Sequence, residues 1–141
     1  MTETASDFQK FLLEQHVCDH PFRYFAGFAR RLAFFDHSQM IDLFEDALDE
    51  GKITESEFDQ LRFLSALGRG RDRNTGESLH LAGVASYTID NKALDHAVML
   101  AKLLQKITGT KVLPVIAGKV ITDVAEKHAL AYGINWTLRE D

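Results

Sequence analysis

The phenylalanines of this 141-residue chain are confined to one part of it, since all ten lie at or before Phe63. β-Branched residues do the reverse and concentrate after residue 83. Such a change of texture along a chain indicates a change in the kind of secondary structure. It predicts a Phe-rich helical extension over residues 1–65, followed by an α/β core over residues 66–141.

The extension is predicted to form about four helices. The first covers residues 6–17, where apolar side chains recur at helical spacing. The second is expected over residues 22–35, which are apolar nearly all round. A helix that is apolar on most faces must be buried on most faces, either by its own domain or by a partner. Its large side chains are therefore candidates for a homo-oligomer interface: Phe22, Phe25, Phe28, Leu32 and Phe35.

Capping signals mark the third and fourth helices. Ser38 is expected to cap the third, and Gly51 to end it. The fourth begins with Thr54-Glu55-Ser56-Glu57, a capping box in which Thr54 accepts the amide of Glu57 and the Glu57 side chain reaches back.

The core is expected to run in the order hairpin, helix, strand, helix, strand. The hairpin turn is Asn74 to Glu77, the long helix is capped by Asp90, and Pro114 points to an edge strand or a bulge. The expected spans are strands over 67–73 and 78–89, a helix over 91–108, a strand over 111–117, a helix over 120–132 and a strand over 134–138. Helical crossovers between the later strands imply a mixed sheet with parallel pairing there, and so an α/β fold.

The charge of the chain is uneven. The net charge is −5, which argues against broad, non-specific binding of nucleic acid. Residues 1–64 hold 13 acidic and 6 basic residues, a balance of −7, whereas residues 65–141 hold 8 acidic and 10 basic residues, a balance of +2. The second half therefore stays open to a phosphate-bearing partner.

The composition predicts a cytoplasmic protein. Cys18 is the single cysteine, which excludes an intrachain disulfide and fits a reducing compartment. No apolar run approaches the ~20 residues that a membrane-spanning helix needs, and the N-terminus does not read as a signal peptide. We expect no membrane partner.

Two chemical interpretations compete for Asp90-x-Lys92. It has the acid-x-lysine spacing of a metal-dependent nuclease, in which both side chains project from one face of a strand onto a metal and a phosphate. Here the pair stands where a strand gives way to a helix, so Asp90 is better placed to accept amides of the first helical turn. We therefore expect a helix cap, with a catalytic pair as the alternative.

A second candidate lies in Arg69-Gly70-Arg71-Asp72-Arg73. The three arginines alternate and so point to one side of a strand, where, with Lys111, they form a candidate contact line for phosphates. The competing interpretation is a solvated edge strand that is kept from pairing by its charge. Asp72 is a candidate metal ligand or simply the ion-pair partner of these arginines.

No cofactor or metal site is expected from the residues alone. His16-x-Cys18-x-His20 carries soft ligand types, but a structural zinc site needs a second pair and no matching cysteine exists. Mg²⁺ or Mn²⁺ would be required only by the nuclease alternative, with Asp72, Asp90 and Lys92 at its site.

The second half resembles a known group of proteins. The runs LHLAGVASYTID, ALDHAVMLAKLLQKITG and KVLPVIAGKVITDVAEKHALAYGI are similar to the C-terminal part of small uncharacterised prokaryotic proteins of the restriction-endonuclease-like, PD-(D/E)XK superfamily. The preceding DALDEGKITESEFDQL resembles the helical lead-in of such proteins. The resemblance implies a nuclease-like core. It places the first acid near Ala66, the second at Val84 and the lysine at Ser86, so all three are absent here.

The leading expectation for function follows from that absence. Phosphodiester hydrolysis in this fold needs carboxylates that hold the metal. We therefore expect a catalytically inactive nuclease-like domain that acts as a binding or homo-oligomeric assembly module, and enzymatic activity stays an open question. The alternatives are the metal-dependent nuclease and a nucleic-acid-binding module without chemistry.

Overall fold

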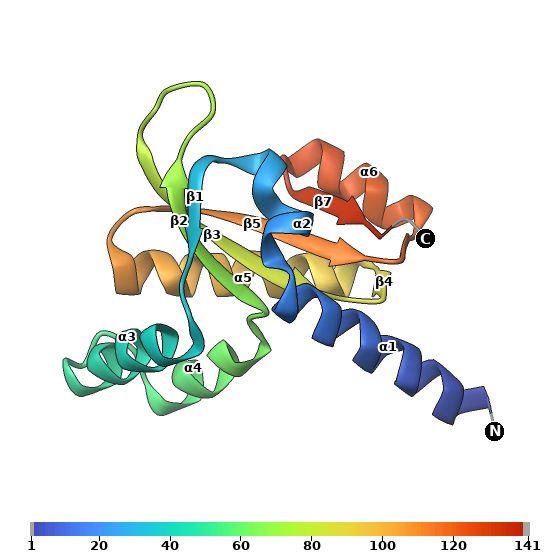
Figure 1. The fold of residues 1–141 in the computed structure, drawn as a ribbon, viewed down its shortest axis with the longest axis horizontal. Coiled ribbons are helices and arrows are strands. Elements are labelled where there is room, and N and C mark those ends of the chain that lie inside the picture. Colours follow the sequence, from blue (N-terminus) through green and yellow to red (C-terminus); the bar gives the residue numbers. More distant parts are fainter. Residues whose placement is uncertain (1, 140–141) are drawn as a thin grey trace.

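The protein is built around one mixed β-sheet. The structure, a computed structural model, describes residues 2–139, with side chains from Asp7 onward. Within that range five strands form the sheet in the order β1-β2-β3-β5-β7 (Figure 1). The strands are β1 (Arg30–Phe34), β2 (Ala66–Arg71), β3 (Ser78–Ala85), β5 (Lys111–Gly118) and β7 (Asn135–Leu138). The first three pair antiparallel, and β5 and β7 continue the sheet in parallel.

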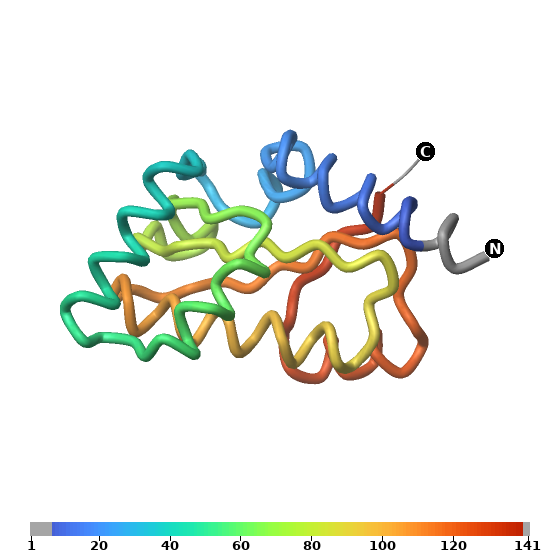
Figure 2. The backbone as a smooth tube through the Cα atoms, turned by 90° about the horizontal axis from the view of Figure 1, so that it is seen from below, coloured from blue at the N-terminus to red at the C-terminus, as the bar shows by residue number. Residues whose placement is uncertain are grey.

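Helices cover both faces of this sheet. In Figure 2, α1 and α2 lie on one face, α5 and α6 lie on the other, and α3 and α4 close one end. The helices are α1 (Thr2–Asp19), α2 (Pro21–Phe25), α3 (His37–Asp49), α4 (Glu55–Gln60), α5 (Asn91–Thr108) and α6 (Asp123–Tyr132), with 3₁₀ turns η1 (Ala26–Phe28) and η2 (Leu61–Phe63). A small parallel pair, β4 (Thr88–Ile89) and β6 (Val120–Ile121), adjoins the sheet. The α/β class and the order hairpin, helix, strand, helix, strand are confirmed.

The alternation of side chains along the strands produces two cores. Leu81, Val115 and Ala117 face α1 and α2, where they pack with Val17 and Phe25. The neighbouring strand residues face α5 and belong to a second cluster that also takes in α3, α4 and α6. Both clusters, like the sheet, contain residues from each side of position 65.

The helix predicted over residues 22–35 is wrong for most of its length. The α-helix ends at Phe25, and Arg30–Phe34 form the edge strand β1, which pairs with β2. The register shifts between Arg30 and Ala33, and Arg31 adopts a φ of 52° at that irregularity. Arg, Leu, Ala and Phe are all compatible with a helix locally, so pairing with a distant strand decides the conformation here.

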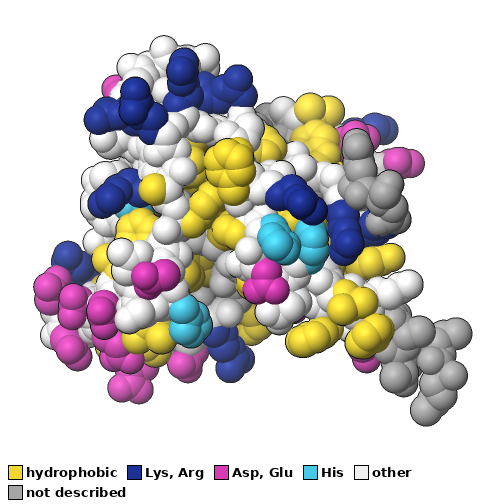
Figure 3. All heavy atoms as spheres, viewed as in Figure 1, with side chains coloured by type: hydrophobic (Ala, Val, Ile, Leu, Met, Phe, Trp, Pro, Cys, Tyr) yellow, Lys and Arg dark blue, Asp and Glu magenta, His cyan; other side chains and the backbone are white. Residues whose placement is uncertain are grey.

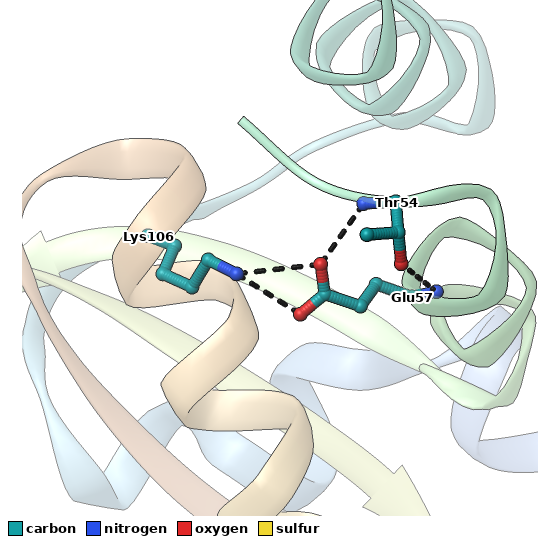
Figure 4. A network of polar contacts seen from close by, with 3 residues as sticks. All are labelled: Thr54, Glu57 and Lys106. Atoms are coloured by element: carbon teal, nitrogen blue, oxygen red, sulfur yellow. Dashed lines mark hydrogen bonds and ion pairs between the residues drawn. The ribbon is translucent and has the colours of Figure 1, made fainter. Parts of the chain in front are cut away.

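The capping signals are largely confirmed. Thr54 and Glu57 form the predicted box, with hydrogen bonds of 2.9 and 3.1 Å, and Lys106 of α5 contacts the Glu57 carboxylate at 3.0 Å (Figure 4). That ion pair ties α4 to α5. The cap of α3 is Asp36 rather than Ser38, because the Asp36 carboxylate accepts the Gln39 amide at 2.7 Å.

Pro114 does not lie on an edge strand, contrary to expectation. It is in β5, which pairs with β3 on one side and β7 on the other. However, β7 begins to pair only at Val115, so β5 has a single neighbour at the proline. A residue without an amide hydrogen is tolerated where one side of a strand has no partner.

Candidate functional site

The SYTIDNK stretch, residues 86–92, lines a cleft at the C-terminal end of β3. The cleft has a volume of about 850 Å³ and lies between α1, the end of β3 and the first turns of α5. Charged side chains line it from two sides, with Lys10 and Glu14 from α1 and with Asp90 and Lys92 beside α5. The two residues of α1 could not be assigned to this site from the sequence, because only the tertiary fold places them there.

Asp90 is the N-cap of α5, as predicted. Its backbone is extended, with φ of −112° and ψ of 179°, and its carboxylate accepts the amide of Ala93 at 2.8 Å. Lys92 is exposed in the first turn of the helix. The helix ends at Gly109, whose φ of 70° is readily adopted only by glycine. Both ends of α5 are therefore explained by local chemistry.

Asp72 organises the tip of the β2–β3 hairpin. One carboxylate oxygen accepts the amides of Asn74 and Thr75 at 2.8 and 3.0 Å, and the other contacts the Lys111 ammonium at 3.1 Å. These two amides, together with Lys111, lower the pKa of the Asp72 carboxyl to about 2. Its interaction is therefore with the turn and with Lys111.

The fold does not bring Asp72 and Asp90 together. Asp72 precedes β3 and Asp90 follows it, so the eight residues of that strand separate them. At ~3.3 Å per residue, this separation is roughly 25 Å. Two carboxylates share a metal ion only when both reach within ~2.6 Å of it. The three residues of the nuclease alternative therefore do not form one site in this structure.

The resemblance places the superfamily's two acids and its lysine at Ala66, Val84 and Ser86, which carry apolar or hydroxyl side chains here. Ala66 and Val84 are buried at neighbouring places on β2 and β3. Ser86 lines the cleft and donates its hydroxyl to the carbonyl of Thr88 at 2.9 Å. The carboxylates of Glu14 and Asp90 line the same cleft.

Basic side chains gather at the hairpin end of the sheet. Figure 3 shows Lys and Arg over the β2–β3 hairpin and β1, and Asp and Glu over α3 and α4. Arg30 of β1 lies opposite Arg71 of β2, so the edge strand adds to the predicted arginines. Residues 36–60 at the other end hold nine acidic residues and one basic residue. The molecule therefore has a basic end and an acidic end.

The predicted basic residues also make contacts within the chain. The Arg69 guanidinium lies 6.0 Å from the centre of the Phe35 ring, and Arg71 donates to the carbonyl of Gly76 at 3.1 Å. Arg73 donates to the carbonyl of Gly27. Lys111 is the member of the set whose partner is a carboxylate, that of Asp72. A guanidinium bound to a carbonyl keeps its positive charge, so these contacts position the arginines without neutralising them.

The predicted interface residues are placed very differently from one another. Phe25 is fully buried in the core and cannot contact a partner. Phe28, Leu32 and Phe35 are partly buried against the two clusters. Phe22 is exposed, at 67% of its surface.

A larger apolar surface lies on α1, which the sequence analysis did not select. Phe8, Phe11 and Leu12 are 60%, 57% and 45% exposed, whereas Leu13 and Val17 of the same helix are buried under the body. Figure 1 shows the N-terminal part of α1 extending beyond the sheet. This exposed surface could have been predicted from the sequence, because α1 carries apolar side chains on two of its faces. A helix needs only one apolar face to pack on its own domain.

His16, Cys18 and His20 do not converge on a common point for a metal. The His16 ring nitrogen Nδ1 lies 2.5 Å from the Tyr24 hydroxyl, and the His16 and His20 rings are tilted against each other with centroids 4.7 Å apart. Cys18 is exposed. Within the side chains that the structure describes, no three His, Cys, Asp or Glu residues are grouped as metal ligands.

Comparison with protein-family models, with curated proteins and with solved structures finds no match for this chain. Across the described residues, no helix is long and apolar enough to cross a membrane. The structure defines the protein as a mixed α/β domain with a leading helix.

Proposed function

We propose that this chain is a non-catalytic assembly module of nuclease-like fold, which associates with further copies of itself through the exposed face of α1. The observation that carries the proposal is the row formed by Phe8, Phe11 and Leu12, about half or more of whose surfaces are exposed. Three adjacent large apolar side chains on a projecting helix are typical of a protein–protein contact.

The order of the sheet supports the nuclease-like part of the proposal. An antiparallel hairpin is followed by α5, which crosses to the parallel strand β5. This arrangement agrees with the one that the resemblance of residues 79–138 implies.

The contacts of the two candidate aspartates support a non-catalytic role. Asp90 accepts an amide of α5, and Asp72 is held by a turn and by Lys111 at the opposite end of β3. Val84 and Ser86 occupy the places where the superfamily carries an acid and a lysine. A metal that activates water needs converging carboxylates. The described hydrogen bonds and ion pairs of the two aspartates are to backbone amides and to Lys111.

A second function is favoured by the basic end. Arg30 of β1 lies opposite Arg71 of β2, and Asp and Glu gather instead over α3 and α4. A polyanion that approached this end would meet a row of guanidinium groups and would be steered away from the acidic end. Binding of a nucleic-acid backbone without chemistry is therefore the alternative to assembly, and both can hold together.

The molar mass of the wild-type chain in solution tests the main proposal. Light scattering over a range of concentrations is expected to show a species larger than the 15.9 kDa monomer. A chain that stays monomeric at every concentration would contradict the proposal, and binding of DNA by that monomer would favour the alternative.

A further inference from the structure

An apolar groove opens at the base of α1. It has a volume of about 670 Å³ and lies between the end of β1, the helix α3 and the turn of α4 into β2. Cys18 and Pro21, at the junction of α1 and α2, are among the residues that line it. Its apolar lining is provided mainly by Phe34, Phe35, Met40, Ile41, Phe44 and Phe58. Figure 3 shows hydrophobic side chains on this face of the molecule, between α3 and α2.

The exposed row on α1 leads to this groove. The exposed positions Phe8, Phe11, Gln15 and Cys18 follow one another at intervals of three or four residues, and Leu12 lies four residues after Phe8 and three before Gln15. Such positions lie on one face of an α-helix. The same face therefore carries the exposed phenylalanines at the tip of α1 and borders the groove at its base.

We propose that α1 of one copy packs antiparallel along α1 of a second copy, so that each Phe8 enters the groove of the other. Phe8 and Cys18 are ten residues apart, which is about 15 Å along a helix. When two such helices run antiparallel along the exposed face, the tip of each reaches the base of the other. The arrangement has two-fold symmetry and closes on itself as a dimer. This proposal rests on the self-association proposed above and specifies how the two copies are arranged.

The area that each helix offers explains why two insertions are needed. A large apolar side chain buries on the order of 200 Å², so Phe8, Phe11 and Leu12 together offer roughly 300 Å² at their observed exposures. Counted on both surfaces, one insertion covers about 600 Å², and the symmetric pair covers about 1,200 Å². Specific protein–protein interfaces begin at ~1,200 Å². A single insertion falls short of that size, whereas the reciprocal pair reaches it.

The native Cys18 allows a direct test by disulfide cross-linking. In Phe8→Cys, the new thiol is expected to lie beside Cys18 of the other copy. A disulfide between residues 8 and 18 of one chain is excluded, because a disulfide joins Cα atoms about 4.4–6.8 Å apart. Mild oxidation with oxidised glutathione should therefore convert most of the Phe8→Cys protein to a covalent dimer on a non-reducing gel.

Three controls separate this geometry from others. Lys10→Cys places a thiol on the opposite face of α1 and should not cross-link. The double variant Phe8→Cys with Cys18→Ser should lose the cross-link. Ile41→Asp puts a charge on an exposed residue of the groove, and it should abolish cross-linking by Phe8→Cys without unfolding the protein, as checked by circular dichroism.

The outcomes distinguish this inference from the proposed function. Cross-linking that persists without Cys18 would mean that the tips of α1 meet each other, and it would overturn the antiparallel arrangement. A Phe8→Cys protein that light scattering shows to be oligomeric like the wild type, but that does not cross-link, would overturn the arrangement and leave self-association standing. A Phe8→Cys protein that becomes monomeric while the wild type is oligomeric would support the role of Phe8 in the contact. A strictly monomeric wild-type protein would contradict both.

Discussion

Gly83 of β3 lies directly beneath the ring of Phe25: an ideal Cβ on Gly83 would stand 2.6 Å from Cε2 and 2.7 Å from Cζ of that ring. Phe25 is fully buried, so moving its ring aside would displace other side chains of the close-packed core. The close approach of α2 to the sheet at this point therefore requires a residue without a side chain. The close approach to Gly83 also explains why Phe25, alone among the predicted interface residues, is fully buried.

Replacement of Gly83 tests this contact. We expect Gly83→Ala to lower the free energy of unfolding by about 1–3 kcal/mol, because an added methyl group overpacks the core. Urea denaturation gives the value. Phe25→Leu in the same chain should recover part of the loss. Gly27→Ala is the matched control, since a Cβ there meets nothing within 4 Å, and an equal loss in that variant would rule out the explanation.

Removal of the Asp90 carboxylate should affect stability and not metal binding. We expect Asp90→Ala to cost about 1 kcal/mol, the usual price of a lost N-cap, and Asp90→Ser to retain most of the stability. Lys92→Ala is the control and should change little. Isothermal titration of Mn²⁺ into wild type and Asp90→Ala should give the same result. A saturable site that disappears in Asp90→Ala would instead support the nuclease alternative.

The carboxyl of Asp72 should titrate far below its ordinary range. Its pKa is about 2 in the folded protein, and the unfolded value is ~3.9. Because the folded value is the lower one, ionised Asp72 stabilises the fold above pH ~4, and that contribution is lost as the pH falls from ~4 to ~2.

Nuclear magnetic resonance of the Asp72 side chain measures this pKa directly. In Lys111→Met the midpoint should rise but stay below ~3.9, because the amides of Asn74 and Thr75 contribute more than Lys111 does. A wild-type midpoint at the ordinary value would mean that the turn does not hold the carboxylate.

Binding of a polyanion at the basic end should depend on salt and on Arg71. The affinity for a DNA oligonucleotide should fall steeply with salt, because each phosphate contact releases counterions. Arg71→Ala should weaken binding and reduce the slope of log K against log salt by about 1. Arg23→Ala, outside the basic end, is the control. Equal effects of the two variants, or affinity that does not depend on salt, would contradict binding at this end.

Most helix ends that depend on local contacts could be predicted from the sequence, although the cap of α3 was expected at Ser38 and is Asp36. The capping box at Thr54, the cap at Asp90 and the end of α5 at Gly109 each depend on residues within one turn of one another, and each was predicted correctly. The order of elements after residue 66 could be predicted for the same reason, because turns and caps separate its strands and helices.

The conformation of residues 30–34 depends on distant residues. Leu32 lies so close to Gly68 of β2 that a Cβ there would stand 2.8 Å from its Cδ1. Gly70 next along β2 would place a Cβ 2.8 Å from the carbonyl oxygen of Arg30. The two glycines make room for β1, and they lie more than thirty residues away, so the periodicity of residues 22–35 could not reveal the strand.

The surface of the molecule was the least predictable part. Phe22 and Phe25 are three residues apart in one apolar run, yet one is exposed and the other is fully buried. Which phenylalanines face outward depends on how α1 and α2 lie on the sheet. The lining of the cleft at the end of β3 could not be predicted from the sequence for the same reason. Glu14 lies there only because α1 packs against that part of the sheet.

The central claim is that the exposed face of α1 holds copies of this chain together. The most direct measurement compares the molar masses of wild type, Phe11→Asp and Phe22→Asp by light scattering after size-exclusion chromatography. We expect wild type and Phe22→Asp to give twice the 15.9 kDa of the monomer, and Phe11→Asp to give the monomer mass with an unchanged circular dichroism spectrum. An oligomer that survives Phe11→Asp, or one that is lost equally in Phe22→Asp, would contradict the claim.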